Sequence, residues 1–228
     1  MIASRRMAVV LLLGFSCGLP LLLTASVLQA WLKREGVSLE AIGLMALVGL
    51  PYTLKFLWAP LLDRFTIPGL GRRRGWLLAA QLALALSIVS LGLTDPVAAP
   101  WLVAFVAMLV TFFSATQDVV VDAHRRETLA ENELGLGSSL YVYGYRTGML
   151  LASGGGLILA DHLPFPTVYG ILALAMVIGV VTTLLADEPV IHGAPPASLA
   201  AAVAGPFRDY FARRVAWPVL LFILLYKL

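Results

Sequence analysis

Long runs of apolar residues, separated by short polar segments, dominate this chain. The runs fall near residues 8–31, 41–62, 76–93, 101–123, 138–160 and 166–186. About 20 apolar residues are enough for a helix to cross a bilayer, so each run predicts a membrane-spanning helix. A seventh apolar run starts at Ala216 and reaches Leu228, which is too short to cross. Because a half-span would leave backbone groups without partners in lipid, we expect the chain to be part of a longer protein.

These runs divide the chain into three predicted parts: a six-helix bundle over 1–187, a central loop over 188–215, and the start of a seventh helix over 216–228. The loop begins with a proline- and glycine-containing stretch that is typical of a linker. It ends in a basic and aromatic segment, for which both an interfacial helix and a solvated connector remain open. The predicted fold class is an all-α integral membrane protein.

Composition supports the membrane assignment. Of the 228 residues, 60% are apolar and 13% are charged, and the mean hydropathy is +0.91. Soluble domains have about 45–50% apolar and about 25% charged residues. We therefore expect a lipid bilayer and a small-molecule substrate as partners, and no nucleic acid.

The basic residues are distributed unevenly between the two ends of the predicted spans. The N-terminus and the even-numbered loops hold eleven lysine and arginine residues, whereas the odd-numbered loops hold two, Lys33 and Arg34. Lysine and arginine concentrate in cytoplasmic loops of membrane proteins, so the pattern predicts a cytoplasmic N-terminus. The N-terminus and the even-numbered loops carry Arg5, Arg6, Arg64, Arg72, Arg73, Arg74, Arg125, Arg126, Arg208, Arg213 and Arg214.

Three charged residues lie inside different apolar runs. A rise of 1.5 Å per residue places Lys55, Asp118 and Arg146 roughly 10, 8 and 12 Å from the predicted cytoplasmic ends of their spans. Charges inside a membrane are costly and are usually paired and functional. We expect the three to form one charged layer, with Asp122 a turn below it.

Helical spacing indicates which way some of these residues face. Asp118 belongs to a polar stripe on the fourth span, Thr111, Ser114, Asp118 and Asp122. The fifth span has small residues every four positions, Gly144, Gly148, Ala152 and Gly156, and such stripes allow close helix packing. Arg146 points about 200° away from Gly144 and should face another neighbour or a water-filled cavity, on the side of Ser139 and Tyr143.

Each charged residue also has a purely structural interpretation. Lys55 and Arg146 could serve as structural ion-pair partners or could contact an anionic substrate. Asp122 could pair with Arg125 or Arg126 at the helix end, whereas the deeper Asp118 favours a functional role. His124 could relay protons or could be an ordinary surface histidine.

The loop WAPLLDRFTIPGLGRRRGW, residues 58–76, resembles a signature of the major facilitator superfamily, G-x-L-a-D-R-x-G-R-K. The matching residues are Leu61, Asp63, Arg64, Gly71, Arg72 and Arg73. Ala59 replaces the first glycine, and the insertion TIPGL separates the two halves. The resemblance implies an interdomain latch made by Asp63, Arg64, Arg72 and Arg73, to which we add Arg125.

The segments LPYTLKFLWAPLLDR, SATQDVVVDAHRRE, GSSLYVYGYRTGML and LLFILLYKL resemble a facilitator subfamily that contains muropeptide permeases and acetyl-CoA transporters. This implies the N-terminal six-helix half of a facilitator, in a bacterial inner membrane. It also implies proton-driven import of anhydro-muropeptides for peptidoglycan recycling, a process that influences β-lactamase induction. No cofactor is implied, because the proton gradient supplies the driving force.

The implied transport assigns a role to each candidate residue. Desolvation favours protonation of a carboxyl group and a nearby cation opposes it, so Asp118, or else Asp122, is the candidate proton carrier. The candidate substrate-binding residues are Lys55, Tyr52, Tyr143, Arg146 and Gln117.

Two other functions stay open from the sequence. A related facilitator could carry another anionic solute such as acetyl-CoA, or a sugar, and a membrane sensor could transport nothing. A membrane enzyme is disfavoured, because neither catalytic nor metal-binding motifs are present.

Overall fold

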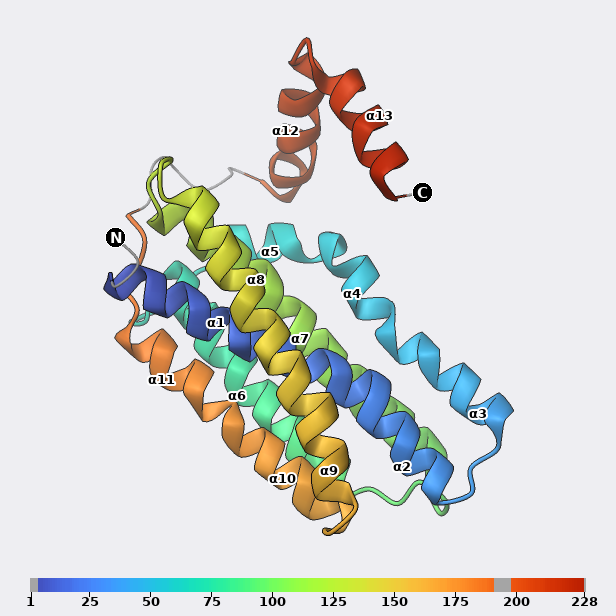
Figure 1. Ribbon diagram of the computed structural model, residues 1–228. Coiled ribbons are helices and arrows are strands. Elements are labelled where there is room, and N and C mark those ends of the chain that lie inside the picture. Colours follow the sequence, from blue (N-terminus) through green and yellow to red (C-terminus); the bar gives the residue numbers. More distant parts are fainter. Residues whose placement is uncertain (1–3, 191–197, 228) are drawn as a thin grey trace.

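The computed structural model describes residues 4–190 and 198–227, and within those ranges every regular element is a helix. Within these ranges, the elements up to Leu185 join into six rods that form a bundle, and Figure 1 shows how the rods are arranged. The first rod contains α1 (Arg5–Leu22), η1 (Leu23–Val27) and α2 (Leu28–Arg34). The second contains α3 (Leu39–Leu44), η2 (Met45–Gly49), α4 (Leu50–Leu54), η3 (Lys55–Leu57) and α5 (Ala59–Arg64).

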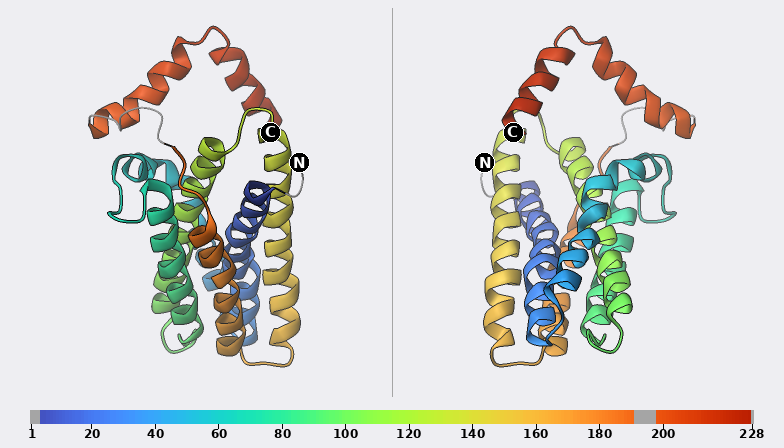
Figure 2. Two further views of the ribbon diagram at one scale, coloured as in Figure 1. Left: turned by 90° about the vertical axis from the view of Figure 1, so that its left-hand side faces the viewer. Right: turned by 90° about the vertical axis from the view of Figure 1, so that its right-hand side faces the viewer.

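The remaining rods are more regular. The third is α6 (Arg72–Gly92) and the fourth is α7 (Pro100–Thr128). The fifth joins α8 (Leu134–Leu150), η4 (Leu151–Gly155) and α9 (Gly156–Ala160). The sixth joins α10 (Phe165–Ala175) and α11 (Val177–Leu185). Then α12 (Leu199–Ala212) and α13 (Ala216–Lys227) stand beyond the end of the bundle that carries the N-terminus (Figure 2).

Five of the described rods are long and apolar enough to cross a membrane: Arg5–Arg34, Leu39–Leu57, Arg72–Gly92, Pro100–Thr128 and Phe165–Leu185. The fifth rod, over residues 134–160, is about as long, roughly 40 Å at 1.5 Å per residue. Its glycines, serines and Arg146 make it less apolar than the others. All six expected spans therefore have a helical counterpart, and five of them are strongly apolar.

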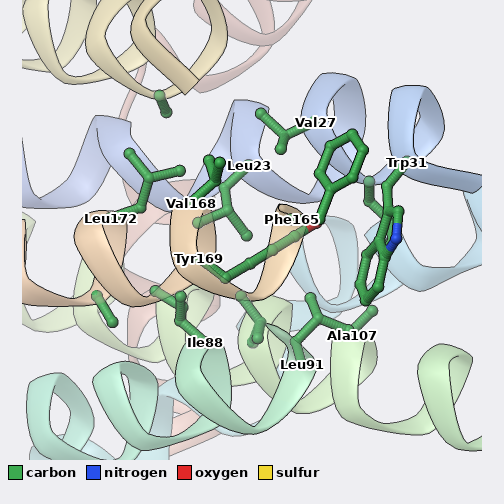
Figure 3. Packing of buried hydrophobic residues seen from close by; sticks show 14 of the residues in the cluster. Leu23, Val27, Trp31, Ile88, Leu91, Ala107, Phe165, Val168, Tyr169 and Leu172 are labelled. Atoms are coloured by element: carbon green, nitrogen blue, oxygen red, sulfur yellow. The ribbon is translucent and has the colours of Figure 1, made fainter. Parts of the chain in front are cut away.

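The main hydrophobic core lies toward the end of the bundle opposite the N-terminus, and Figure 3 shows part of its packing. Trp31 stacks on Phe165 with ring centroids 5.5 Å apart, and Tyr169 lies at the same distance from Trp31. Leu23 and Ile88, from the first and third rods, are fully buried in the same cluster. The cluster contains residues of all six rods and fixes the framework on which the polar side chains sit.

Glycines on the first and fifth rods bring their backbones into direct contact. An added Cβ at Gly144 would overlap the carbonyl oxygen of Leu11, and one at Gly148 would overlap that of Phe15. Gly14 on the first rod is in the same situation, because the backbone of the fifth rod leaves no space there for a Cβ. The stripe on the fifth rod is therefore a packing surface, as its spacing predicts.

Candidate functional site

The centre of the candidate site is an ion pair between the second and fourth rods. Lys55 Nζ lies 3.9 Å from Asp118 Oδ2. The Asp118 side chain is only 9% exposed, while that of Lys55 is 35% exposed. The carboxylate is thus enclosed by protein, whereas the lysine side chain is partly exposed.

The enclosure of Asp118 is completed by the first rod. Cys17 is fully buried and its thiol lies beside the carboxylate. Asp118 Oδ1 is buried without a hydrogen-bond partner among the described residues. A buried carboxylate oxygen without a partner is costly, and a proton on it would remove its charge.

Gln117 takes a different place from the expected one. It is fully buried, donates from Nε2 to Cys17 Sγ at 3.3 Å, and accepts from Ser16 Oγ at 3.4 Å. A substrate cannot reach its amide in this arrangement. In this arrangement the Gln117 side chain links α1 to α7 beside Asp118.

The polar stripe of α7 is the surface that holds the second rod. Tyr52 donates to Ser114 Oγ at 2.9 Å, and Trp58 Nε1 donates to Thr116 Oγ1 at 3.1 Å. Thr111 donates to the Val48 carbonyl at 2.6 Å. These bonds extend above and below the Lys55–Asp118 pair and hold both residues at the same level.

Arg146 and Tyr143 do not join this ion pair. Both are exposed, and no ion pair of Arg146 occurs within the described part of the chain. Tyr143 lies in a shallow apolar groove with Phe15 and Ile178, away from Asp118. The expected layer of three charges is thus a pair in this structure, because Arg146 faces outward from the fifth rod.

Two tyrosines that the sequence reading did not single out lie on the inner side of α8. Tyr141 and Tyr145 pack against Cys17 and neighbouring apolar residues, with their ring centroids 5.9 Å apart. Arg125 lies over the Tyr141 ring at 4.5 Å and also binds Asp122 at 3.1 Å. Their spacing of four residues is the signal that could have identified the two tyrosines as one face.

A second polar cluster lies at the end of the bundle that holds the N-terminus. Arg73 binds Asp63 at 2.8 Å and Glu127 at 2.5 Å, and Arg72 also binds Glu127, at 2.9 Å. These contacts link α5, α6 and α7. Arg64 lies outside this cluster, with its guanidinium 5.8 Å from the centre of the Phe65 ring.

Glu188, just after the sixth rod, joins the same cluster. Its carboxylate accepts from the backbone N–H groups of Arg73 and Arg74 at 2.8 and 2.9 Å, so it caps α6. Gly71 has a φ of +85°, and a Cβ there would collide with the Glu188 carboxylate. Glu127 and Glu188 lie outside the facilitator signature, and no local sequence pattern singles them out.

His124 is buried in the same region rather than exposed. Its Nε2 lies 3.0 Å from the Asp187 carbonyl, and its Nδ1 is buried without a partner in the described residues. Across the described part of the chain, no group of three or more His, Cys, Asp or Glu side chains could hold a metal ion.

Long apolar rods, with an ion pair between two of them and a charge cluster at one end, define a multi-pass helical membrane protein. Comparison with known families agrees with this, because the model of the Major Facilitator Superfamily matches residues 5–227. The chain belongs to the Major Facilitator Superfamily.

Individual relatives are similar over almost the whole chain. The chain is 45% identical over 224 residues to the anhydromuropeptide permease of Escherichia coli (strain K12), covering 98% of this chain and 46% of that protein. It is 43% identical over 231 residues to an uncharacterized protein of Haemophilus influenzae, covering 99% and 54%. The chain thus spans about half the length of these relatives.

Proposed function

We propose that this chain forms the N-terminal half of a transporter that imports anhydro-muropeptides together with protons. The observation that carries the proposal is the enclosed Asp118 beside the partly exposed Lys55. The similarity to the anhydromuropeptide permease supports the choice of substrate. In this proposal the transporter needs no cofactor, and the proton gradient drives import.

The ion pair suggests how proton and substrate binding are linked. A carboxylate of the substrate competes with Asp118 for the Lys55 ammonium group. Once Lys55 turns to the substrate, Asp118 is left as an uncompensated buried charge, and binding a proton removes that cost. Release of the substrate restores the pair and expels the proton. One proton site and one anion site are thus coupled through one lysine.

The proposal includes a location and an orientation. Eleven basic residues on one side against two on the other support a cytoplasmic N-terminus in a bacterial inner membrane. Facilitators alternate access around a site near the middle of the membrane. The cluster around Arg73 would then lie at the cytoplasmic end, where Asp63 and Arg73 hold helix ends together while the outer side is open.

Uptake into membrane vesicles that contain the full-length protein tests this function. Asp118→Asn should abolish accumulation driven by a proton gradient, yet retain exchange of labelled anhydro-muropeptide across the membrane without a gradient. Asp122→Asn is the matched control, because Asp122 is about half exposed and pairs with Arg125. It should accumulate substrate normally.

The contrary results are clear for each part of the proposal. Undiminished accumulation by Asp118→Asn would remove the proton role from Asp118, and its loss in Asp122→Asn would move that role to Asp122. Unlabelled acetyl-CoA or a simple sugar that competes better than anhydro-muropeptide would show a different cargo. No uptake by the unaltered protein would favour a sensor.

A further inference from the structure

We propose that a cavity between the first and second rods binds an uncharged sugar ring of the transported molecule, next to the charged site at Lys55. The cavity has a volume of about 190 Å³. It lies where η1, a π-helical turn, faces η2, a 3₁₀ turn. The inference rests on the proposed function, because it assigns one part of the proposed substrate to one part of the site.

The irregular turns have local causes and create the space. Pro20 in α1 has no N–H to donate, and the π turn begins three residues later at Leu23. Thr24 lies in that turn and donates its hydroxyl proton to the carbonyls of Pro20 and Leu21 at 3.2 Å. π turns inside helices occur frequently at functional sites. The described lining residues are Leu21, Thr24, Ala25, Gln29, Met45, Ala46, Val48, Gly49 and Tyr52.

The hydrogen-bonding groups of the cavity match a ligand that carries hydroxyl groups. The Thr24 hydroxyl donates to backbone carbonyls, and the Tyr52 hydroxyl donates to Ser114. The hydroxyl oxygen of each residue can therefore only accept a hydrogen bond from a ligand. Gln29 is exposed and lines the cavity, so its amide can both donate and accept. A sugar hydroxyl or an N-acetyl group can donate to these two oxygens, whereas a carboxylate, which can only accept, could bond to the Gln29 amide alone.

The charge of the lining residues and the size of the cavity also favour an uncharged sugar ring. The described lining residues are all uncharged. A volume of about 190 Å³ is below the roughly 300–1,000 Å³ of pockets for drug-sized ligands, and it suits one ring rather than a whole muropeptide. Lys55 comes one helical turn after Tyr52. A substrate with a neutral sugar at one end and a carboxylate at the other would therefore lie along the second rod.

Gly49 allows the cavity to be filled without disturbing the fold. A Cβ added there meets no atom within 4 Å. Gly43, on the same rod and outside the cavity, has the same open space and provides the matched control. Leucine at either position adds the same volume, so a difference between the two variants reports on the cavity itself.

Binding to the full-length protein is measured by calorimetry with two probes. One is the disaccharide of N-acetylglucosamine and anhydro-N-acetylmuramic acid, and the other is anhydro-N-acetylmuramic acid alone. Gly49→Leu should weaken binding of the disaccharide at least tenfold and leave binding of the single sugar acid unchanged. Gly43→Leu should change neither. Gln29→Ala should reproduce the selective loss, and it provides the test if Gly49→Leu fails to fold.

The outcomes separate this inference from the proposed function. If the unaltered protein binds neither probe, the proposed function fails. If it binds the disaccharide and both Gly49→Leu and Gln29→Ala bind it equally well, the cavity is not a sugar site and the inference is wrong. Equal weakening for both probes would also overturn it, since the cavity would then not distinguish the uncharged ring.

Discussion

Lys55 and Asp118 share one contact but lie in different surroundings. Lys55 lies in η3, a 3₁₀ segment of three residues, and its side chain is partly exposed. Asp118 lies in the C-terminal half of the 29-residue helix α7 and is enclosed. Removing one partner of a buried ion pair leaves an uncompensated charge, which costs far more than the pair contributes when intact. The enclosed carboxylate therefore depends on the lysine more than the lysine depends on it.

This asymmetry predicts an order of stabilities. Lys55→Ala should lower the free energy of unfolding by about 1–3 kcal/mol, because it leaves the Asp118 charge buried and unpaired. Adding Asp118→Asn to that variant should recover part of the loss, since the buried charge is then absent. Denaturant unfolding of the purified protein in detergent measures both.

The exposed pair of Arg213 and Asp209, four residues apart on the surface, provides the comparison. Removal of Arg213 should change the free energy of unfolding by about 0.3–0.5 kcal/mol, as for other exposed helical pairs. A double variant of Lys55 and Asp118 that is less stable than Lys55→Ala would contradict the account of the buried charge.

For single residues, the sequence predicts how deep a charged side chain lies in its span better than it predicts which neighbouring helix that side chain faces. Counting along each span placed Lys55 and Asp118 at one level, and the structure brings them within 3.9 Å. It placed Arg146 there too, but depth does not determine which neighbour a side chain faces. Gln117 shows the same limit: it adjoins Asp118 in the chain, yet it points into the packing against α1.

At the scale of elements, the second rod departs most from its prediction. The apolar run over 41–62 predicts one continuous helix, whereas the structure has α3, η2, α4, η3 and α5 in that stretch. Pro51 and Pro60, at the starts of α4 and α5, supply no N–H for the preceding turns. Apolar periodicity does not reveal such breaks, and these breaks open the cavity beside Gly49 and set Lys55 in its own turn.

The contact of the first and fifth rods leads to a prediction about Gly148. Gly148→Ala should lower the melting temperature, because its Cβ would overlap the Phe15 carbonyl and overpacking typically costs about 1–3 kcal/mol. Cys17, the one cysteine of this chain, is buried next to the contact between α1 and α8. If that contact loosens, alkylation of Cys17 by N-ethylmaleimide should become faster.

Gly154 is the control for that substitution. It lies on the same rod, and an added Cβ there meets no atom within 4 Å. Gly154→Ala should leave both the melting temperature and the alkylation of Cys17 unchanged. If the two alanine variants behaved alike, close backbone contact would not be what holds α1 against α8.

At the scale of the whole molecule, the charge cluster ties together helix ends that are far apart in the sequence. Asp63, Arg73, Glu127 and Glu188 come from or follow the second, third, fourth and sixth rods. The recognised signature contains Asp63 and Arg73 but not the two glutamates. Their contribution depends on how four rods meet at one end, which local sequence patterns do not encode.

Glu127 is the carboxylate of this cluster that binds two arginines, Arg72 and Arg73. Glu127→Gln keeps the shape of the side chain and removes both ion pairs. It should lower the free energy of unfolding by about 1.5–3 kcal/mol, as for hydrogen bonds to charged groups. A double-mutant cycle with Arg73→Gln should give a coupling energy of about 0.5–3 kcal/mol.

Glu131→Gln makes the same change of charge at an exposed position four residues later and should shift stability by less than about 0.5 kcal/mol. Equal effects at 127 and 131 would mean that net charge, and not the cluster, determines stability. A coupling energy near zero between Glu127 and Arg73 would mean that the helix ends are held by apolar packing alone. A large coupling at this end, together with sensitivity of transport to Lys55, would place structural support and substrate binding in separate parts of the bundle.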